Sequence, residues 1–124
     1  MFDHVGIDVR DWKKSQAFYE AALKPLGSKL LVAWEEYKAA GFGTDRPRFW
    51  IGQGSPTNGS DDVHICFTAK DRASVRAFYD AAIKAGGVDH GKPGLRPQYH
   101  QDYYGAFVLD PDGNNVEACC HLPE

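Results

Sequence analysis

The chain has 124 residues, of which 43% are hydrophobic and 25% are charged, and its formal net charge is -3. This length suits a single domain with a working core, and the weak negative charge excludes a broad electrostatic attraction to nucleic acid. Because no apolar run approaches the roughly 20 residues that span a bilayer, and no secretion signal opens the chain, we expect a cytoplasmic protein that binds neither nucleic acid nor membranes.

Residues 1 to 54 are predicted to form a strand, a helix and three further strands. Val5, Ile7 and Val9 alternate with small or polar residues, which is typical of a strand with one apolar face. Asp11 is a favourable helix N-cap, and the helix that follows is expected over residues 13 to 25. Shorter strands are then expected over residues 29 to 34, 36 to 42 and 48 to 53.

Residues 62 to 124 are predicted to repeat this order of elements. A strand begins at His64 and places Ile65 and Phe67 on its apolar face, and Asp71 is the N-cap of a helix expected over residues 72 to 85. Further strands are expected over residues 87 to 90, 103 to 109 and 114 to 121. Residues 92 to 101 form the longest irregular stretch, of a kind that often covers a site.

The two halves align with each other at an offset of 60 residues. Nine of the 24 positions from 4 to 27 are identical to their counterparts, and the offset superposes His4 on His64. We therefore predict one domain over residues 1–124, duplicated internally as residues 1–54 and 62–124 with a linker over residues 55–61. The expected fold is α+β, with two tandem βαβββ modules that form a curved mixed-sheet cup and carry their helices on the convex side.

The three cysteines, Cys66, Cys119 and Cys120, all lie in apolar segments. Free cysteine in such segments usually behaves as a small buried hydrophobe, and an odd number of cysteines fits a reducing compartment. Cys119 and Cys120 are adjacent in a predicted strand and should face opposite ways, which argues against a disulfide or a shared metal between them.

Three side chains of metal-ligating type share one face of the predicted sheets. Each helix must cover the apolar face, so His4 and His64 point to the open face, and strand alternation puts Glu117 there as well. Two imidazoles and a carboxylate suit one divalent transition metal, namely Zn, Ni, Mn, Co or Fe(II), with positions left open for water or substrate. The structural alternatives are that duplication alone kept both histidines and that Glu117 is a solvated surface residue.

Candidates for proton transfer lie just before the strand over residues 103 to 109. His100, Tyr103 and Tyr104 can each act as acid or base, although strand tyrosines commonly pack and loop histidines are commonly solvated. Arg96 is predicted to bind an anionic group of a substrate, with an exposed loop arginine as the alternative. His121 shares the predicted face of Glu117 and is a reserve metal ligand.

Residues 4–9 (HVGIDV), the paired Ala-Phe-Tyr helices and residues 110–117 (DPDGNNVE) resemble the vicinal oxygen chelate superfamily. This superfamily includes glyoxalase I, extradiol dioxygenases, fosfomycin-resistance thiol transferases, methylmalonyl-CoA epimerase and bleomycin-binding proteins. The resemblance implies metal ligands at His4, His64 and Glu117. The fourth ligand position of glyoxalase I falls on Trp50, which cannot bind a metal, so the resemblance implies an open three-ligand site with Trp50 as a wall of the substrate cavity or as core packing.

The expected function is that of a metal-dependent, glyoxalase-like enzyme acting on a small oxygen-rich molecule. Lyase, isomerase, dioxygenase and thiol-transferase chemistry all fit, because in each the metal stabilises a chelated oxyanion. The alternative is a metal-free small-molecule or drug-binding protein of the bleomycin-resistance type. We expect a homodimer, and the sequence leaves open whether the halves of one chain pair with each other or are exchanged between two chains.

Overall fold

The computed structural model describes residues 1–55 and 63–124, so all but the first residue of the predicted linker lies outside the described part. The first module comprises β1 (Val5–Val9), α1 (Trp12–Leu23), the 3-10 helix η1 (Lys24–Leu26), β2 (Lys29–Trp34), β3 (Ala39–Gly43) and β4 (Phe49–Gln53). The second module comprises β5 (His64–Thr68), α2 (Arg72–Lys84), β6 (Val88–Leu95), β7 (Tyr104–Leu109) and β8 (Asn115–Cys120).

Both modules have the same sheet topology. The strand order β1-β4-β3-β2 of the first recurs as β5-β8-β7-β6 in the second. In each module the opening strand pairs in parallel with the last strand, and the other pairs are antiparallel. Asp11 accepts a hydrogen bond from the Lys14 backbone N–H, and Asp71 does the same for Ser74, so both helices are capped as predicted. The expected α+β fold of two tandem βαβββ modules is confirmed.

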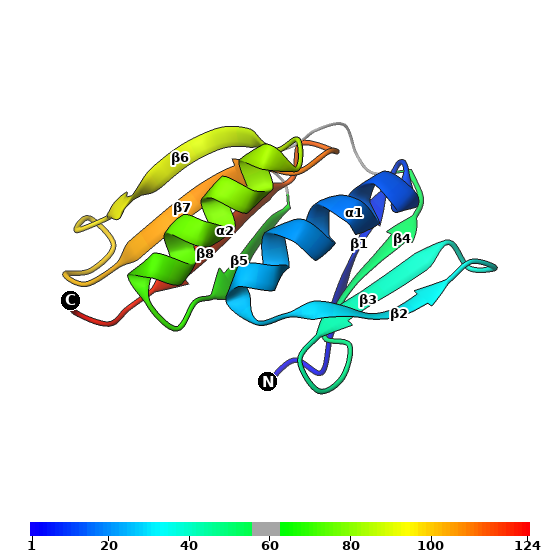
Figure 1. Ribbon diagram of the computed structural model, residues 1–124, viewed down its shortest axis with the longest axis horizontal. Helices are drawn as coiled ribbons and strands as arrows, with labels where there is room; N and C mark the ends of the chain where they lie inside the picture. The colour runs from blue at the N-terminus through cyan, green and yellow to red at the C-terminus, as the bar shows by residue number, and fades with distance from the viewer. Residues whose placement is uncertain (56–62) are drawn as a thin grey trace.

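The helices of the two modules pack against each other on one side of the sheets (Figure 1). One hydrophobic core runs through both modules and contains Phe18 and Tyr19 of α1 and Phe78 of α2, all essentially inaccessible to solvent. The two sheets remain separate. In Figure 1, β1 and β5 run in opposite directions, with β1 beginning near the lower edge of the view and β5 near the upper edge. The two opening strands therefore run antiparallel to each other in this view.

Strand β6 is longer than the predicted strand over residues 87 to 90, because it continues to Leu95. Register shifts on both sides of Gly91 break the regular alternation of side chains. Pro93 is tolerated in this strand because β6 forms the edge of its sheet, where one row of backbone groups has no partner strand. The strand was underestimated because a bulged edge strand lacks the local signs that the prediction used.

The other boundaries differ from the predictions by a few residues, for local reasons. Strand β3 begins at Ala39 instead of residue 36, because residues 35–38 form a turn in which Lys38 has a φ of 51°. Helix α1 ends at Leu23 and continues as η1, which contains Pro25. Among the helices in the described ranges, none is long and apolar enough to cross a membrane.

Candidate metal centre

His64 and Glu117 meet on the open face of the second sheet. Strand β5 pairs in parallel with β8, and this register brings the start of β5 beside the carboxylate. The distance between His64 Nε2 and Glu117 Oε2 is 2.9 Å. The Glu117 side chain is only 2% exposed, whereas that of His64 is 44% exposed. One ligand is therefore buried and the other borders the solvent.

The imidazole of His64 is oriented by two contacts. Its Nδ1 lies 3.2 Å from the backbone carbonyl oxygen of Asn115, so the Nδ1 proton is donated to that oxygen. The ring of Phe107 stacks on the imidazole at a centroid distance of 6.0 Å and an interplanar angle of 21°. In the neutral ring, this tautomer leaves the lone pair of Nε2 free for a cation.

The carboxylate of Glu117 is held by a second side chain. The Tyr103 hydroxyl donates a hydrogen bond to Glu117 Oε1. Burial and this hydrogen bond raise the pKa of Tyr103, so the phenol stays protonated and remains a donor. A Cβ atom at Gly105 would lie 3.1 Å from both Glu117 Oε1 and the Tyr103 ring, so glycine leaves the space that this pair occupies. Tyr103 thereby holds Oε1 and leaves Oε2 for other partners.

The geometry of this pair fits a shared metal ion. Two ligand atoms that each lie about 2.1 Å from one ion are about 3.0 Å apart when they subtend a right angle at it. The 2.9 Å between Nε2 and Oε2 matches this separation. Without a cation, this contact is a hydrogen bond between the imidazole and the carboxyl group. His64 and Glu117 thus supply two adjacent ligands of a transition-metal site, which still needs a third.

His4 lies in the other module, at the start of β1. It is exposed, and its Nδ1 lies 2.7 Å from Asp3 Oδ1. The hydrogen bonds from His4 and Arg46 lower the pKa of Asp3 to about 2, so this carboxylate stays ionised and holds the imidazole proton on Nδ1. In the described part of the chain, the one group of three potential ligands with all ligand atoms within 4.8 Å contains neither His4 nor His64. One chain therefore does not assemble the three predicted ligands.

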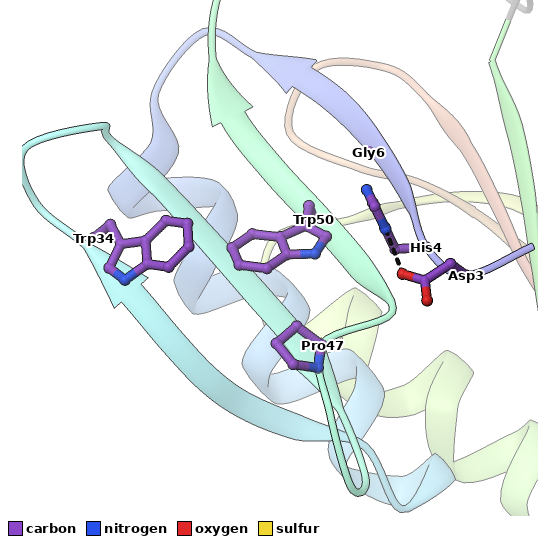
Figure 2. Close-up of a pocket in the computed structure, with 6 residues that line it drawn as sticks. All are labelled: Asp3, His4, Gly6, Trp34, Pro47 and Trp50. Atoms are coloured by element: carbon purple, nitrogen blue, oxygen red, sulfur yellow. Dashed lines mark hydrogen bonds and ion pairs between the residues drawn. The ribbon is translucent and has the colours of Figure 1, made fainter.

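His4 borders a cavity of about 520 Å³ on the open face of the first sheet (Figure 2). Its lining consists of Asp3, His4, Gly6, Trp34, Pro47 and Trp50. The rings of Trp34 and Trp50 lie 5.1 Å apart and form one wall. Trp50 pairs with Gly6 in the sheet, as Glu117 pairs with Cys66 in the second module, so Trp50 occupies the position equivalent to Glu117. Trp34 was not predicted as a site residue, although a large apolar residue at the end of a predicted strand can be recognised in the sequence.

Comparison with known proteins identifies the family. The profile of the Glyoxalase/Bleomycin resistance protein/Dioxygenase superfamily matches residues 1–118. The chain belongs to this superfamily. A crystal structure of a glyoxalase/bleomycin resistance protein from Albidiferax ferrireducens is 31% identical, with a TM-score of 0.85, and the alignment covers 97% of this chain and 98% of that chain. No curated protein matches the sequence significantly.

More distant members of the superfamily share the fold. The fosfomycin resistance protein FosX from Mesorhizobium loti is 18% identical, with a TM-score of 0.73 and coverage of 98% of this chain and 92% of that chain. A mutant of FosX from Listeria monocytogenes, complexed with Mn(II) and dihydroxypropylphosphonic acid, is 17% identical, with a TM-score of 0.72 and coverage of 95% and 87%. At these identities the likeness concerns the fold alone.

In this glyoxalase-like fold, His100 and Tyr104 lie in different surroundings. The His100 ring lies 5.3 Å from Tyr103 and 4.5 Å from His121, at the margin of the open face. The Tyr104 side chain points away from the open face, because neighbouring side chains alternate along a strand such as β7. Its hydroxyl accepts a hydrogen bond from Arg76 of α2 at 3.3 Å. The structure therefore brings His100 close to Tyr103, the residue that holds Glu117, and does not bring Tyr104 there.

Arg96 lies beside the aromatic ring that supports His64. Its guanidinium is 5.5 Å from the centroid of Phe107, and it donates a hydrogen bond of 2.7 Å to the Lys92 carbonyl oxygen. A cavity of about 290 Å³ adjoins this contact. Its lining includes Arg96, Phe107 and Asn115. The predicted anion-binding residue therefore lies one aromatic ring away from the candidate metal ligand.

Two cysteines beside Glu117 were missed as site residues. Cys120 is buried as predicted, but the prediction was wrong for Cys66, which is exposed because it faces the open side of β5. The Cys66 Sγ lies 3.3 Å from the Cys119 Sγ. A hydrogen bond from Cys66 lowers the pKa of Cys119 to about 6, and the same bond raises the pKa of Cys66. The 60-residue offset places Cys66 opposite Gly6, so the repeat contained no signal for this pair.

Proposed function

We propose that this chain is a metal-dependent enzyme that acts on a small oxygen-rich molecule. The proposal rests on one observation: the oriented Nε2 of His64 and the free Oε2 of the buried Glu117 are separated by the distance that two ligands of one ion require. The Mn(II) in the complex of Listeria monocytogenes FosX supports a divalent cation for this fold. Such an ion, when bound, supplies Lewis-acid stabilisation of negative charge that develops on substrate oxygens.

The third ligand in this proposal is His4 of a second copy of the chain. Within one chain, His4 and the pair of His64 and Glu117 belong to different sheets, and the two modules are joined through the packing of α1 against α2. A homodimer in which halves are exchanged sets the first module of one copy against the second module of the other. Each of the two cups then contains His4 from one copy and His64 with Glu117 from its partner.

In this proposal, the remaining open-face residues have separate roles around the substrate. Tyr103 is a positioning residue, because it keeps the Glu117 carboxylate turned towards His64. Trp50 packs on the apolar part of the substrate and excludes water, and Arg96 balances anionic charge. His100 moves the proton: its Nδ1 accepts from the Asp102 backbone N–H at 3.3 Å, so the neutral ring carries its proton on Nε2.

A metal-free binding protein of the bleomycin-resistance type is the second candidate. It is favoured by the cavity of about 520 Å³ with its tryptophan wall, which lies in one module and can hold a flat ligand without any metal. The two candidates differ in their dependence on Glu117. A binder would keep its affinity when this carboxylate is removed, whereas the enzyme would lose both metal and turnover.

Metal analysis of the purified protein tests the proposed function. We expect about one metal ion per cup after incubation with Mn or Fe(II), and loss of that ion in His64→Ala and Glu117→Gln. Glu36→Gln removes an exposed carboxylate in the first module and is the matched control, which should keep the metal. Chelator-sensitive turnover of a hemithioacetal, a catechol or an epoxide would then name the reaction. Failure of both ions to bind would favour the binding protein.

A further inference from the structure

Two thiols lie on the open face of the second sheet and have no role in the proposed His64–Glu117 site. Cys66 of β5 and Cys119 of β8 are both free, and their sulfur atoms are 3.3 Å apart. Cys66 pairs with Glu117 in the sheet, so Cys119 is its diagonal neighbour. The side chains of Cys66, Glu117 and Cys119 therefore all lie on the open face of the second sheet.

These side chains form a compact set of metal-ligating atoms. The sulfur atoms of Cys66 and Cys119 and a carboxylate oxygen of Glu117 all lie within 4.8 Å of one another. His121 adds a fourth group, because its Nε2 lies 3.5 Å from the Cys119 Sγ. The carboxylate is buried, whereas Cys66 and His121 are exposed and can be reached from solvent.

The spacings approach those of a tetrahedral ion. With metal–sulfur bonds of about 2.3 Å and metal–nitrogen bonds of about 2.0 Å, two sulfur ligands lie about 3.8 Å apart and a sulfur and a nitrogen about 3.5 Å apart. The distance from Cys119 Sγ to His121 Nε2 is 3.5 Å, and the distance between the two sulfur atoms is 3.3 Å. The thiols therefore need to separate by about half an ångström, which the exposed Cys66 side chain can provide.

A disulfide suits this pair less well than a bridging ion. A disulfide requires sulfur atoms about 2.05 Å apart, so the two sulfur atoms at 3.3 Å would have to approach by more than about 1 Å, whereas an ion needs them to separate by about half an ångström. An ion bound between the two sulfur atoms makes the link between the strands longer than a direct S–S bond, so the backbone does not need to move. The arrangement across β5 and β8 therefore favours metal binding over oxidation.

We propose that Cys66, Cys119 and Glu117, completed by His121, form a second metal site that binds a thiophilic divalent cation such as Zn²⁺ or Cd²⁺. Thiolate ligands select such cations, whereas imidazole and carboxylate ligands with open positions also accept Mn²⁺ and Fe²⁺. The proposal does not depend on the proposed enzymatic function, because Cys66, Cys119 and His121 have no part in the His64–Glu117 pair, although both sites include Glu117.

Titration of the full, fully reduced chain with Co²⁺ tests this site, because thiolate ligation of cobalt produces near-ultraviolet charge-transfer absorption. We expect this band to appear in the wild-type chain and to disappear in Cys66→Ser and Cys119→Ser. The matched control Cys120→Ala removes a thiol that faces the core and should keep the band. His64→Ala should also keep it, which separates this site from the proposed catalytic metal.

Absence of the band in the wild-type chain, its survival in the Cys66→Ser/Cys119→Ser double variant, or its loss in His64→Ala would overturn the proposal. A second measurement uses the wild-type chain alone and so does not depend on the folding of variants. One equivalent of Zn²⁺ should protect Cys66 and Cys119 from alkylation, as read by peptide mass analysis. Equal alkylation of both cysteines with and without Zn²⁺ would contradict the second site.

Discussion

The exchanged arrangement of the proposed metal centre can be tested by mixing two inactive variants. His4→Ala removes the ligand of the first module, and Glu117→Gln removes the buried carboxylate of the second. Each homodimer then lacks one ligand in both of its cups and should hold no Mn(II). In a heterodimer with exchanged halves, one cup lacks both ligands, whereas the other contains an intact His4 from one copy and an intact Glu117 from its partner.

The size of the rescue follows from this arrangement. Random association of equal amounts of the two variants makes half of the dimers heterodimers, and each has one intact cup of two, so metal binding should return to about one quarter of the wild-type value. Heterodimers isolated with two different affinity tags should hold one metal instead of two. The matched mixture of His4→Ala with Glu36→Gln should reach about one half, because its Glu36→Gln homodimers keep both cups.

The assay is manganese analysis after incubation with Mn(II), an ion that thiolate ligands do not select, followed by gel filtration of the reassociated dimers, with circular dichroism to show that each variant is folded. Isolated heterodimers that bind no metal, although both variants fold and dimerise, would refute the exchange of halves. Metal retained by His4→Ala alone would show instead that His4 is not a ligand. The two failures are distinguishable because the second is visible before any mixing.

Three further predictions address single side chains. Tyr103→Phe releases Oε1 of Glu117 and should weaken metal binding roughly tenfold to a hundredfold in a competition assay, with the fold unchanged. In metal-free protein, the alkylation rate of Cys119 should rise with a midpoint near pH 6, because a hydrogen bond from Cys66 stabilises its thiolate, and Cys66→Ala, which removes this donor, should move the midpoint upward. Tyr19→Phe removes the hydrogen bond that the Tyr19 hydroxyl donates to the buried Asp110 side chain and should lower the free energy of unfolding by about 2 kcal/mol in urea titrations. Because burial raises the pKa of Tyr19 above its usual 10.0, the wild-type chain should lose stability above pH 10 more steeply than this variant, and equal slopes would contradict that reasoning.

Much of the fold could be read from local patterns. The alternation around Val5 and Ile65 indicates strands with one apolar face, and these residues pack against the core as expected. The caps Asp11 and Asp71 mark the starts of both helices. Strand β6 was underestimated because its bulges and Pro93 remove the alternation on which such a prediction depends.

The candidate site was only partly readable in this way. Strand alternation determines which face a side chain takes, and it correctly put His4, His64 and Glu117 on the faces opposite the helices. It could not place Tyr103 on Glu117 or bring Cys66 to Cys119, since these contacts depend on how β5, β7 and β8 are paired. Such a register is set by long-range contacts in the whole sheet.

The sequence by itself determined the two repeated modules, their helix caps and the open-face position of the three predicted ligands, because each of these depends on the neighbours of a residue along the chain. Only the tertiary structure decided that His64 meets Glu117 while His4 lies apart in the other module. The reason is physical. Helices α1 and α2 pack against each other and bury a core shared by both modules, and this packing sets where the two open faces lie. No single segment of the chain determines this packing.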